Sequence, residues 1–120
     1  MQIETRTSEQ IARYLDLAAS EAKLTAANMA NIDTPGYRTL GMDFEKEMRE
    51  ALNGVNQGNG ARDVRVKRVD GLIARPDGND VSMDRESLNL AEAQLKFKTG
   101  VALLHVEFQR VMDAIHADSK

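Results

Sequence analysis

Two segments, one near each end of the chain, place apolar side chains at alternating spacings of four and three residues. This spacing is typical of amphipathic helices that pack against other helices along a narrow seam. In the first segment, residues 7–32, the seam is rich in small side chains and contains Ile11, Leu15, Ala18, Ala22 and Met29. In the second, residues 82–117, it contains Leu90, Phe97, Val101, Leu104, Phe108, Val111 and Ile115. The pattern therefore predicts a mainly α fold with two long terminal helices, and we call these sets the N-terminal seam and the C-terminal seam.

The second predicted helix is too long for a compact globule of this size. About 35 residues at roughly 1.5 Å each give a rod on the order of 50 Å long. Leu88, Leu95, Leu103 and Met112 add apolar surface outside the C-terminal seam. One partner helix cannot cover all of it, so the pattern favours a coiled-coil-like layer in which several helices assemble. Gly100 in the helix interior costs about 1 kcal/mol relative to alanine and marks either a close helix crossing or a slight bend.

The end of the first helix is predicted by the segment Thr34–Tyr37. Pro35 pre-sets the φ of the second turn position and Gly36 supplies the positive φ that a type II turn needs at the third. Since a residue before proline avoids the α region, the helix must end before Thr34. We expect Asn31 to cap the helix in the left-handed conformation and the Asn28 amide to bind the loop backbone.

Local signals divide the rest of the chain. Thr7 and Gln10 fit a capping box at the start of the first helix. A turn region covers residues 33–42, and Asp43 is expected to cap a short helix over residues 43–53.

Residues 54–81 are rich in glycine and asparagine, which predicts a flexible loop. Within it, Val64 and Val66 alternate with charged residues, as a strand with one solvated face does. Asp70-Gly71 favours a type I′ turn, so residues 72–74 could return as the second strand of a hairpin. A lone hairpin is marginal in water and needs support from the helices or from a neighbouring subunit.

Composition excludes several classes of function. A chain of 120 residues holds at most one domain, its net charge of −3 argues against nucleic acid, and it has no cysteine. Five basic residues gather in the middle of the chain, but no aromatic stacking platform accompanies them. These basic residues are Arg62, Arg65, Lys67, Arg68 and Arg75. A solvated face or an acidic protein neighbour is the favoured interpretation.

No catalytic or metal site is predicted. His105 and His116 are too far apart along one helix to bind the same metal ion. Glu45, Glu47 and Glu50 are expected to form a solvated helix face. No nucleophile motif or phosphate-binding loop is present. The residues therefore predict no enzyme activity, no cofactor and no small-molecule substrate.

The turn segment and two other stretches resemble the flagellar axial proteins. Their N-terminal signature matches this chain at Asn28, Ala30, Asn31, Thr34, Pro35, Gly36 and Tyr37. Asp43-Phe44-Glu45 and residues 77–86 look like the FlgB type of flagellar basal-body rod protein in particular. The resemblance covers roughly residues 8–52 and 76–117.

This resemblance implies a structural subunit of the proximal rod of the bacterial flagellar basal body. In that family the terminal helices pack as an inner layer that transmits torque and surrounds the export channel. The implied partners are other copies of the chain, other rod proteins, proteins at the junction with the membrane ring, and the flagellar export apparatus. The implied location is the rod on the periplasmic side, reached by type III export without a cleaved signal peptide.

Three alternatives remain open from the residues. The absence of an apolar signal run by itself favours a cytoplasmic protein. A soluble helical adaptor or chaperone that binds partner helices would also carry exposed seams. Within the family, the FlgC type of rod subunit is the nearest competitor.

Overall fold

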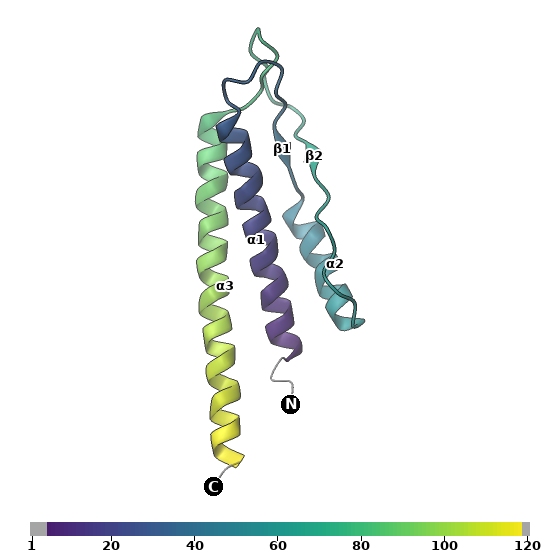
Figure 1. Cartoon of the computed structure of the whole chain (residues 1–120), viewed down its shortest axis with the longest axis vertical. Helices are drawn as coiled ribbons and strands as arrows, with labels where there is room; N and C mark the ends of the chain where they lie inside the picture. The colour runs from purple at the N-terminus through teal and green to yellow at the C-terminus, as the bar shows by residue number, and fades with distance from the viewer. Residues whose placement is uncertain (1–4, 119–120) are drawn as a thin grey trace.

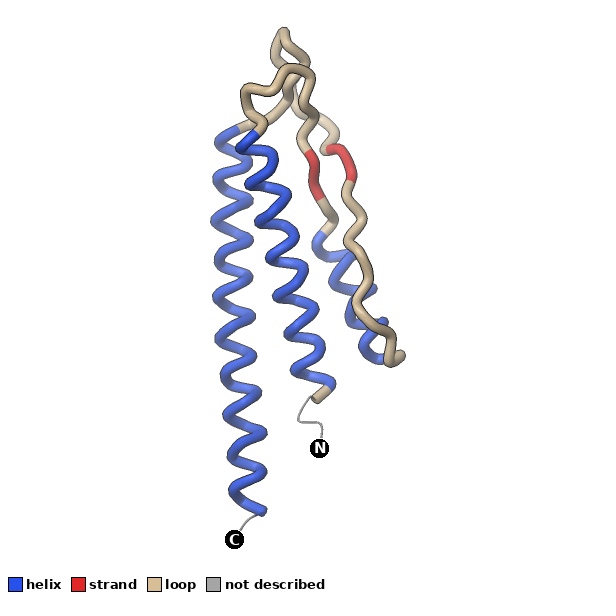
Figure 2. The backbone as a smooth tube through the Cα atoms, viewed as in Figure 1, coloured by secondary structure: helices blue, strands red, loops and turns tan. Residues whose placement is uncertain are grey.

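The computed structural model describes residues 5–118 and shows an elongated, mainly helical molecule measuring 70 × 26 × 19 Å. Its elements are α1 (Arg6–Ala30), β1 (Leu40–Gly41), α2 (Phe44–Asn56), β2 (Lys67–Arg68) and α3 (Met83–Asp118). Helices α1 and α3 run antiparallel side by side, and α2 lies on the other side of α1 (Figure 1). The loops that join α1 to β1 and β2 to α3 meet at one end of the molecule (Figure 2). The predicted fold class is confirmed.

The two ends of α1 differ from the sequence prediction. Its N-cap is Thr5, which forms the capping box with Ser8, so the predicted box at Thr7 is wrong. The Thr5 hydroxyl also donates to Glu107 Oε1 on α3 at 2.8 Å, a contact that sequence spacing does not reveal. At the other end Asn31 has φ −101°, so the left-handed cap predicted there is also wrong. Its side chain instead donates to the Ala27 carbonyl at 2.8 Å.

The contact between α1 and α3 uses small side chains at its centre. Ala18 and Ala93 are buried, and a Cβ atom added to Gly100 would lie 2.6 Å from Leu15 Cδ2 and 3.0 Å from Tyr14 Cδ1. Gly100 therefore allows a close helix crossing, which resolves the two alternatives left open by the sequence. The buried stripe of α3 repeats every seven residues and consists of Glu86, Ala93, Gly100 and Glu107.

The predicted local hairpin does not form. Instead β2 pairs antiparallel with β1, so that Leu40 lies opposite Arg68 and Gly41 opposite Lys67. Gly71 has φ +83°, but Asp70 is not in the positive-φ region that a type I′ turn requires. The physical reason is that β1 is already held against α1, as described below, and offers a supported edge that the isolated 72–74 segment lacks.

Helix α2 packs on α1 through Phe44, and its acidic side chains bind the segment that follows it. Asp43 caps it as predicted, accepting from the Lys46 amide at 3.1 Å. The Phe44 ring meets Tyr14 edge-on with centroids 5.7 Å apart, and Lys96 Nζ of α3 lies 3.8 Å from the Phe44 ring centre. Glu47 is buried and pairs with Arg65 at 2.9 Å, so the prediction that it is solvated is wrong.

Candidate functional site

The C-terminal seam lies beside the stripe of α3 that contacts α1, and much of it remains uncovered. Val101 is 48% exposed and Phe108 51%, and Phe97 and Ile115 are also exposed. The other three members, Leu90, Leu104 and Val111, are half-buried. In the N-terminal seam Ala18 is buried, while Ile11, Leu15, Ala22 and Met29 are half-buried.

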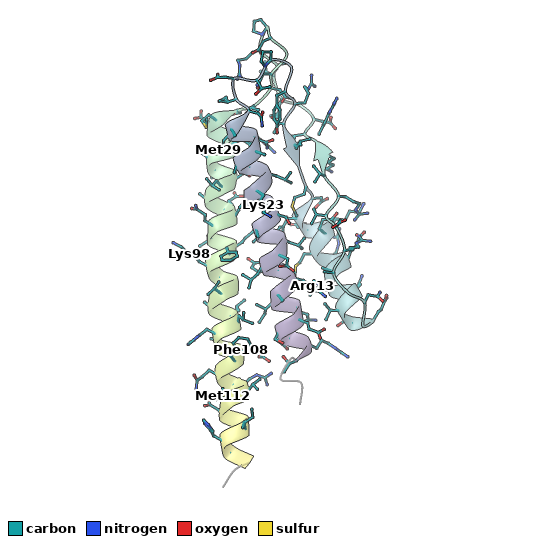
Figure 3. All side chains as sticks on the ribbon, in the orientation of Figure 1. Arg13, Lys23, Met29, Lys98, Phe108 and Met112 are labelled. Atoms are coloured by element: carbon teal, nitrogen blue, oxygen red, sulfur yellow. The ribbon has the colours of Figure 1, made fainter. Side chains whose placement is uncertain are left out.

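Further apolar side chains are exposed around α3. They are Met83, Leu88, Leu95, Leu103, Val106 and Met112. Met112 lies on the part of α3 that extends past the start of α1 (Figure 3). Apolar surface this extensive is rare on a monomeric soluble protein and marks an interaction site. Helix α3 is therefore the main candidate surface for binding to other protein chains.

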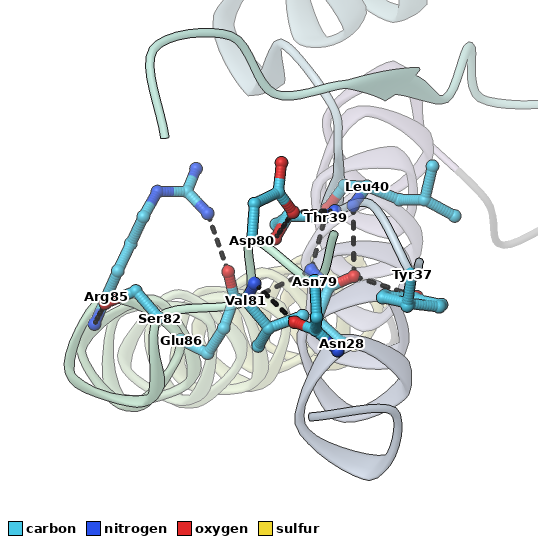
Figure 4. Close-up of polar contacts among 10 residues, drawn as sticks. All are labelled: Asn28, Tyr37, Thr39, Leu40, Asn79, Asp80, Val81, Ser82, Arg85 and Glu86. Atoms are coloured by element: carbon cyan, nitrogen blue, oxygen red, sulfur yellow. Dashed lines mark hydrogen bonds and ion pairs between the residues drawn. The ribbon is translucent and has the colours of Figure 1, made fainter. Parts of the chain in front are cut away.

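Asn28 joins the end of α1 to the segments that follow it. Its Nδ2 donates to the Leu40 carbonyl at 2.8 Å, and its Oδ1 accepts from the Leu40 amide at 3.0 Å. The same Oδ1 accepts from the Tyr37 hydroxyl at 3.0 Å, and Nδ2 also donates to Glu86 Oε2 at 3.1 Å (Figure 4). One buried amide thus connects α1, β1 and the first turn of α3. This is the contact with the loop backbone that the sequence predicted.

The turn after α1 rests on the segment that precedes α3. The Tyr37 amide donates to the Thr34 carbonyl at 3.2 Å, and Gly36 has φ +76°, as a type II turn requires. The Gly36 amide donates to the Asp77 carbonyl at 2.9 Å, and a Cβ atom on Gly78 would lie 3.4 Å from Gly36 Cα. The two segments that carry the family resemblance are therefore in direct contact.

Asn79 binds the turn that follows α1 from a distant part of the chain. Its fully buried Nδ2 donates at 2.9 Å to three carbonyls, those of Asn31, Ile32 and Thr34. Its Oδ1 accepts from the Val81 amide at 2.8 Å. The last carbonyls of the helix itself accept locally from the Asn31 amide. Asn79 instead supplies the donor for the carbonyls of the turn that follows the helix, and so holds that turn against the segment before α3.

Asp80 fixes the loop at Thr39. Its Oδ1 accepts from the Thr39 amide at 2.6 Å and from the Thr39 hydroxyl at 2.9 Å, and its Oδ2 lies 3.2 Å from Arg38 Nε. Burial by itself raises the pKa of Asp80, but the hydrogen bonds from Thr39 and the charge of Arg38 outweigh it and lower that pKa. Arg75 strengthens the same region by donating to the carbonyls of Val81 and Ile32.

Glu86 is the most deeply buried acid of this region. It is fully buried, accepts from Asn28, and pairs with Arg85 Nη1 at 2.6 Å. Burial, and then the nearby charge of Glu86, raise the pKa of Tyr37. The raised pKa favours the protonated phenol, which donates a hydrogen bond to Asn28 Oδ1.

We call the set Asn28, Thr39, Asn79, Asp80 and Glu86 the polar junction. Of these residues, the sequence assigned a role in this contact only to Asn28. Asn79, Asp80 and Glu86 lie in the segment 77–86 that resembles the FlgB type, and the sequence assigns no role to Thr39. The available signal was the run Asp77–Glu86 itself, because short polar side chains before a helix usually bind backbone groups.

The polar junction should make the fold sensitive to acid. Because the pKa of Asp80 is lowered on folding, its carboxylate stabilises the fold above its ordinary pKa of about 3.9, and this contribution is lost as the pH falls through the folded value. Urea unfolding followed by circular dichroism between pH 7 and pH 3 should therefore show a steeper loss for the wild type than for Asp80→Asn. Equal pH dependence of the two proteins would contradict this role.

Other kinds of site find no support in the described part of the chain. Within residues 5–118 no three His, Asp or Glu side chains converge on a possible metal position. A groove of about 510 Å³ lies between α1, α2 and residues 57–64, but ion pairs such as Arg62 with Glu50 occupy its wall. Among the described helices, none has the length and apolar character needed to cross a bilayer.

Comparison with known proteins identifies the family. The chain is 32% identical to the flagellar basal body rod protein FlgB of Salmonella typhimurium, over 84% of this chain and 86% of that protein. It is 32% identical to FlgB of Cereibacter sphaeroides, over 89% and 91% respectively. For FlgB of Escherichia coli the identity is 26%, over 86% and 88%. No protein-family model matches the chain.

The similarity covers more than four fifths of this chain and of each of these relatives. The alternative of an unrelated adaptor is thereby removed. The chain belongs to the FlgB family of flagellar basal body rod proteins, and it is a structural subunit of the flagellar rod rather than an enzyme.

Proposed function

We propose that the subunit joins the rod through the exposed part of the C-terminal seam, which packs against helices of neighbouring subunits. As a rod protein it assembles with rod proteins, and the finer proposal concerns which surface it uses. The neighbours include other copies of the chain, other rod subunits, and proteins at the junction with the membrane ring. Assembled in this way, the terminal helices transmit torque and surround the export channel.

One observation supports this proposal above the rest: the seam residues that face neither α1 nor α2 remain apolar and evenly spaced. Fully burying a side chain the size of valine or phenylalanine stabilises a complex by roughly 1.5–3 kcal/mol. A heptad-like row of such residues on a long helix is the pattern that a neighbouring helix covers. We also propose that the subunit reaches the rod through the flagellar export apparatus, without a cleaved signal peptide.

The absence of cysteine makes a direct test possible. A single cysteine at Val101 should react quickly with a maleimide in the free subunit, because that position is half exposed. In purified, intact basal bodies the same cysteine should be protected, and it should react again after the basal bodies are dissociated. The unsubstituted protein gives the background. Equal labelling in free and assembled protein would show that the seam stays uncovered and would overturn the proposed interface.

A further inference from the structure

A second surface, separate from the seam, lies along the outer edge of β2. β1 lies between α1 and β2, and β2 is on the side of the molecule away from α3 (Figures 1 and 2). Asn28 binds both the amide and the carbonyl of Leu40, so β1 is satisfied on its α1 side. β2 covers the other side of β1, which leaves the far edge of β2 facing solvent.

The hydrogen-bond pattern shows which backbone groups this edge presents. In an antiparallel pair, the amide and carbonyl of one residue point to the same side of the strand. Since both groups of Leu40 point toward Asn28, Leu40 and its partner Arg68 form a non-hydrogen-bonded pair. The Val69 amide donates to the Thr39 carbonyl at 3.0 Å, as this alternation requires. The backbone groups of Arg68 therefore point away from β1, and those of Val66 follow the same alternation.

The side chains around this edge are basic. Residues 64–69 contain Arg65, Lys67 and Arg68 and no acidic residue. Arg65 pairs with Glu47 and Glu50 of α2, whereas Lys67 and Arg68 are exposed and have no ion-pair partner within residues 5–118. Two copies joined edge to edge would place these like charges together, which is unfavourable. The charge thus disfavours self-pairing and favours a partner of opposite sign.

We propose that the edge Val66–Arg68 binds an extended, acidic segment of a partner protein by addition of a β-strand. The open amides and carbonyls supply the backbone hydrogen bonds, and Lys67 and Arg68 select acidic side chains on the partner. This edge belongs to β2 and is separate from α3. The interaction therefore does not depend on the seam and should be detectable with the free subunit.

The probe is a synthetic peptide of about ten alternating threonine and glutamate residues, a length typical of a strand. We expect the Val66 and Arg68 amides of the ¹⁵N-labelled full chain to shift in NMR spectra and to exchange more slowly when the peptide is added. A peptide with an N-methyl group at every residue lacks the donors on both of its edges and should not bind. Binding by the methylated peptide, or no added protection at these two amides, would overturn the proposal.

Two charge-matched variants separate edge recognition from general attraction. Lys67→Glu with Arg68→Glu should weaken peptide binding by about tenfold, because two favourable charge contacts become unfavourable. Lys46→Glu with Arg49→Glu changes the net charge equally at exposed positions of α2 and should leave the affinity within about twofold. Equal weakening by both variants would overturn the proposal. So would sedimentation evidence that the free chain dimerises through this edge, since a second copy would then be the occupant.

Discussion

Asn79→Ala is expected to lower the free energy of unfolding of the free subunit by at least about 3 kcal/mol. The substitution removes the donor shared by three carbonyls of the turn that follows α1 and the acceptor for the Val81 amide. A buried polar group that loses its partner costs roughly 1–3 kcal/mol, and several groups are affected at once. Urea unfolding followed by circular dichroism measures the loss.

Two further variants identify the cause. Asn79→Asp retains the size of the side chain but replaces the donor with an oxygen that faces three carbonyls, so it should be at least as destabilising as alanine. Asn53→Ala, at an exposed position of α2, serves as the control and should change the stability by less than about 0.5 kcal/mol. If Asn79→Asp were as stable as the wild type, the role given to the Asn79 amide would be wrong.

Replacing Val101 and Phe108 together by aspartate is expected to abolish swimming. Both side chains are about half exposed in the free subunit, so the charges remain in water there and the fold should be retained. In the assembled rod the same positions face a neighbouring helix under the proposed function. An unpaired charge buried in an apolar contact is too costly for assembly to proceed. Swimming-zone diameter and electron microscopy of flagella in a strain that carries only the variant gene measure the effect.

Lys98→Glu provides the matched control. It changes the net charge by the same amount on the same helix, and Lys98 points away from α1 (Figure 3). We expect this strain to swim. The circular dichroism spectrum of the purified double variant should match that of the wild type, which excludes unfolding as the cause. Normal flagella in the double variant would remove the C-terminal seam from the assembly interface.

The sequence alone determined the long helices and the turn between α1 and β1. Periodicity suffices for the helices because an amphipathic helix repeats its apolar positions locally, over many turns. Proline and glycine suffice for the turn because each restricts or permits φ at its own position. Asp43 was recognised as a cap for the same reason, since its partner is only three residues away.

Tertiary structure decided the features that depend on residues far apart in the chain. Glu107 on α3 favours Thr5 as the start of α1, and Asn79 holds the turn that follows α1 from 45 residues beyond Thr34. Sequence spacing carries no record of such contacts, because any short polar side chain could make them. The choice of β1 as the partner of β2 likewise depends on the contact between Asn28 and Leu40.

The same limit applies to the C-terminal seam. The sequence predicted its residues but not which of them another helix covers. Periodicity identifies the apolar side of α3, but it cannot show which part of that side α1 covers. The structure places α1 against Ala93 and Gly100, because the absence of a Gly100 side chain leaves room for Leu15. The larger apolar residues beside that stripe then remain uncovered. Periodicity is a property of one helix. How much of that helix a neighbouring helix covers depends on the volumes of the side chains that meet across the contact.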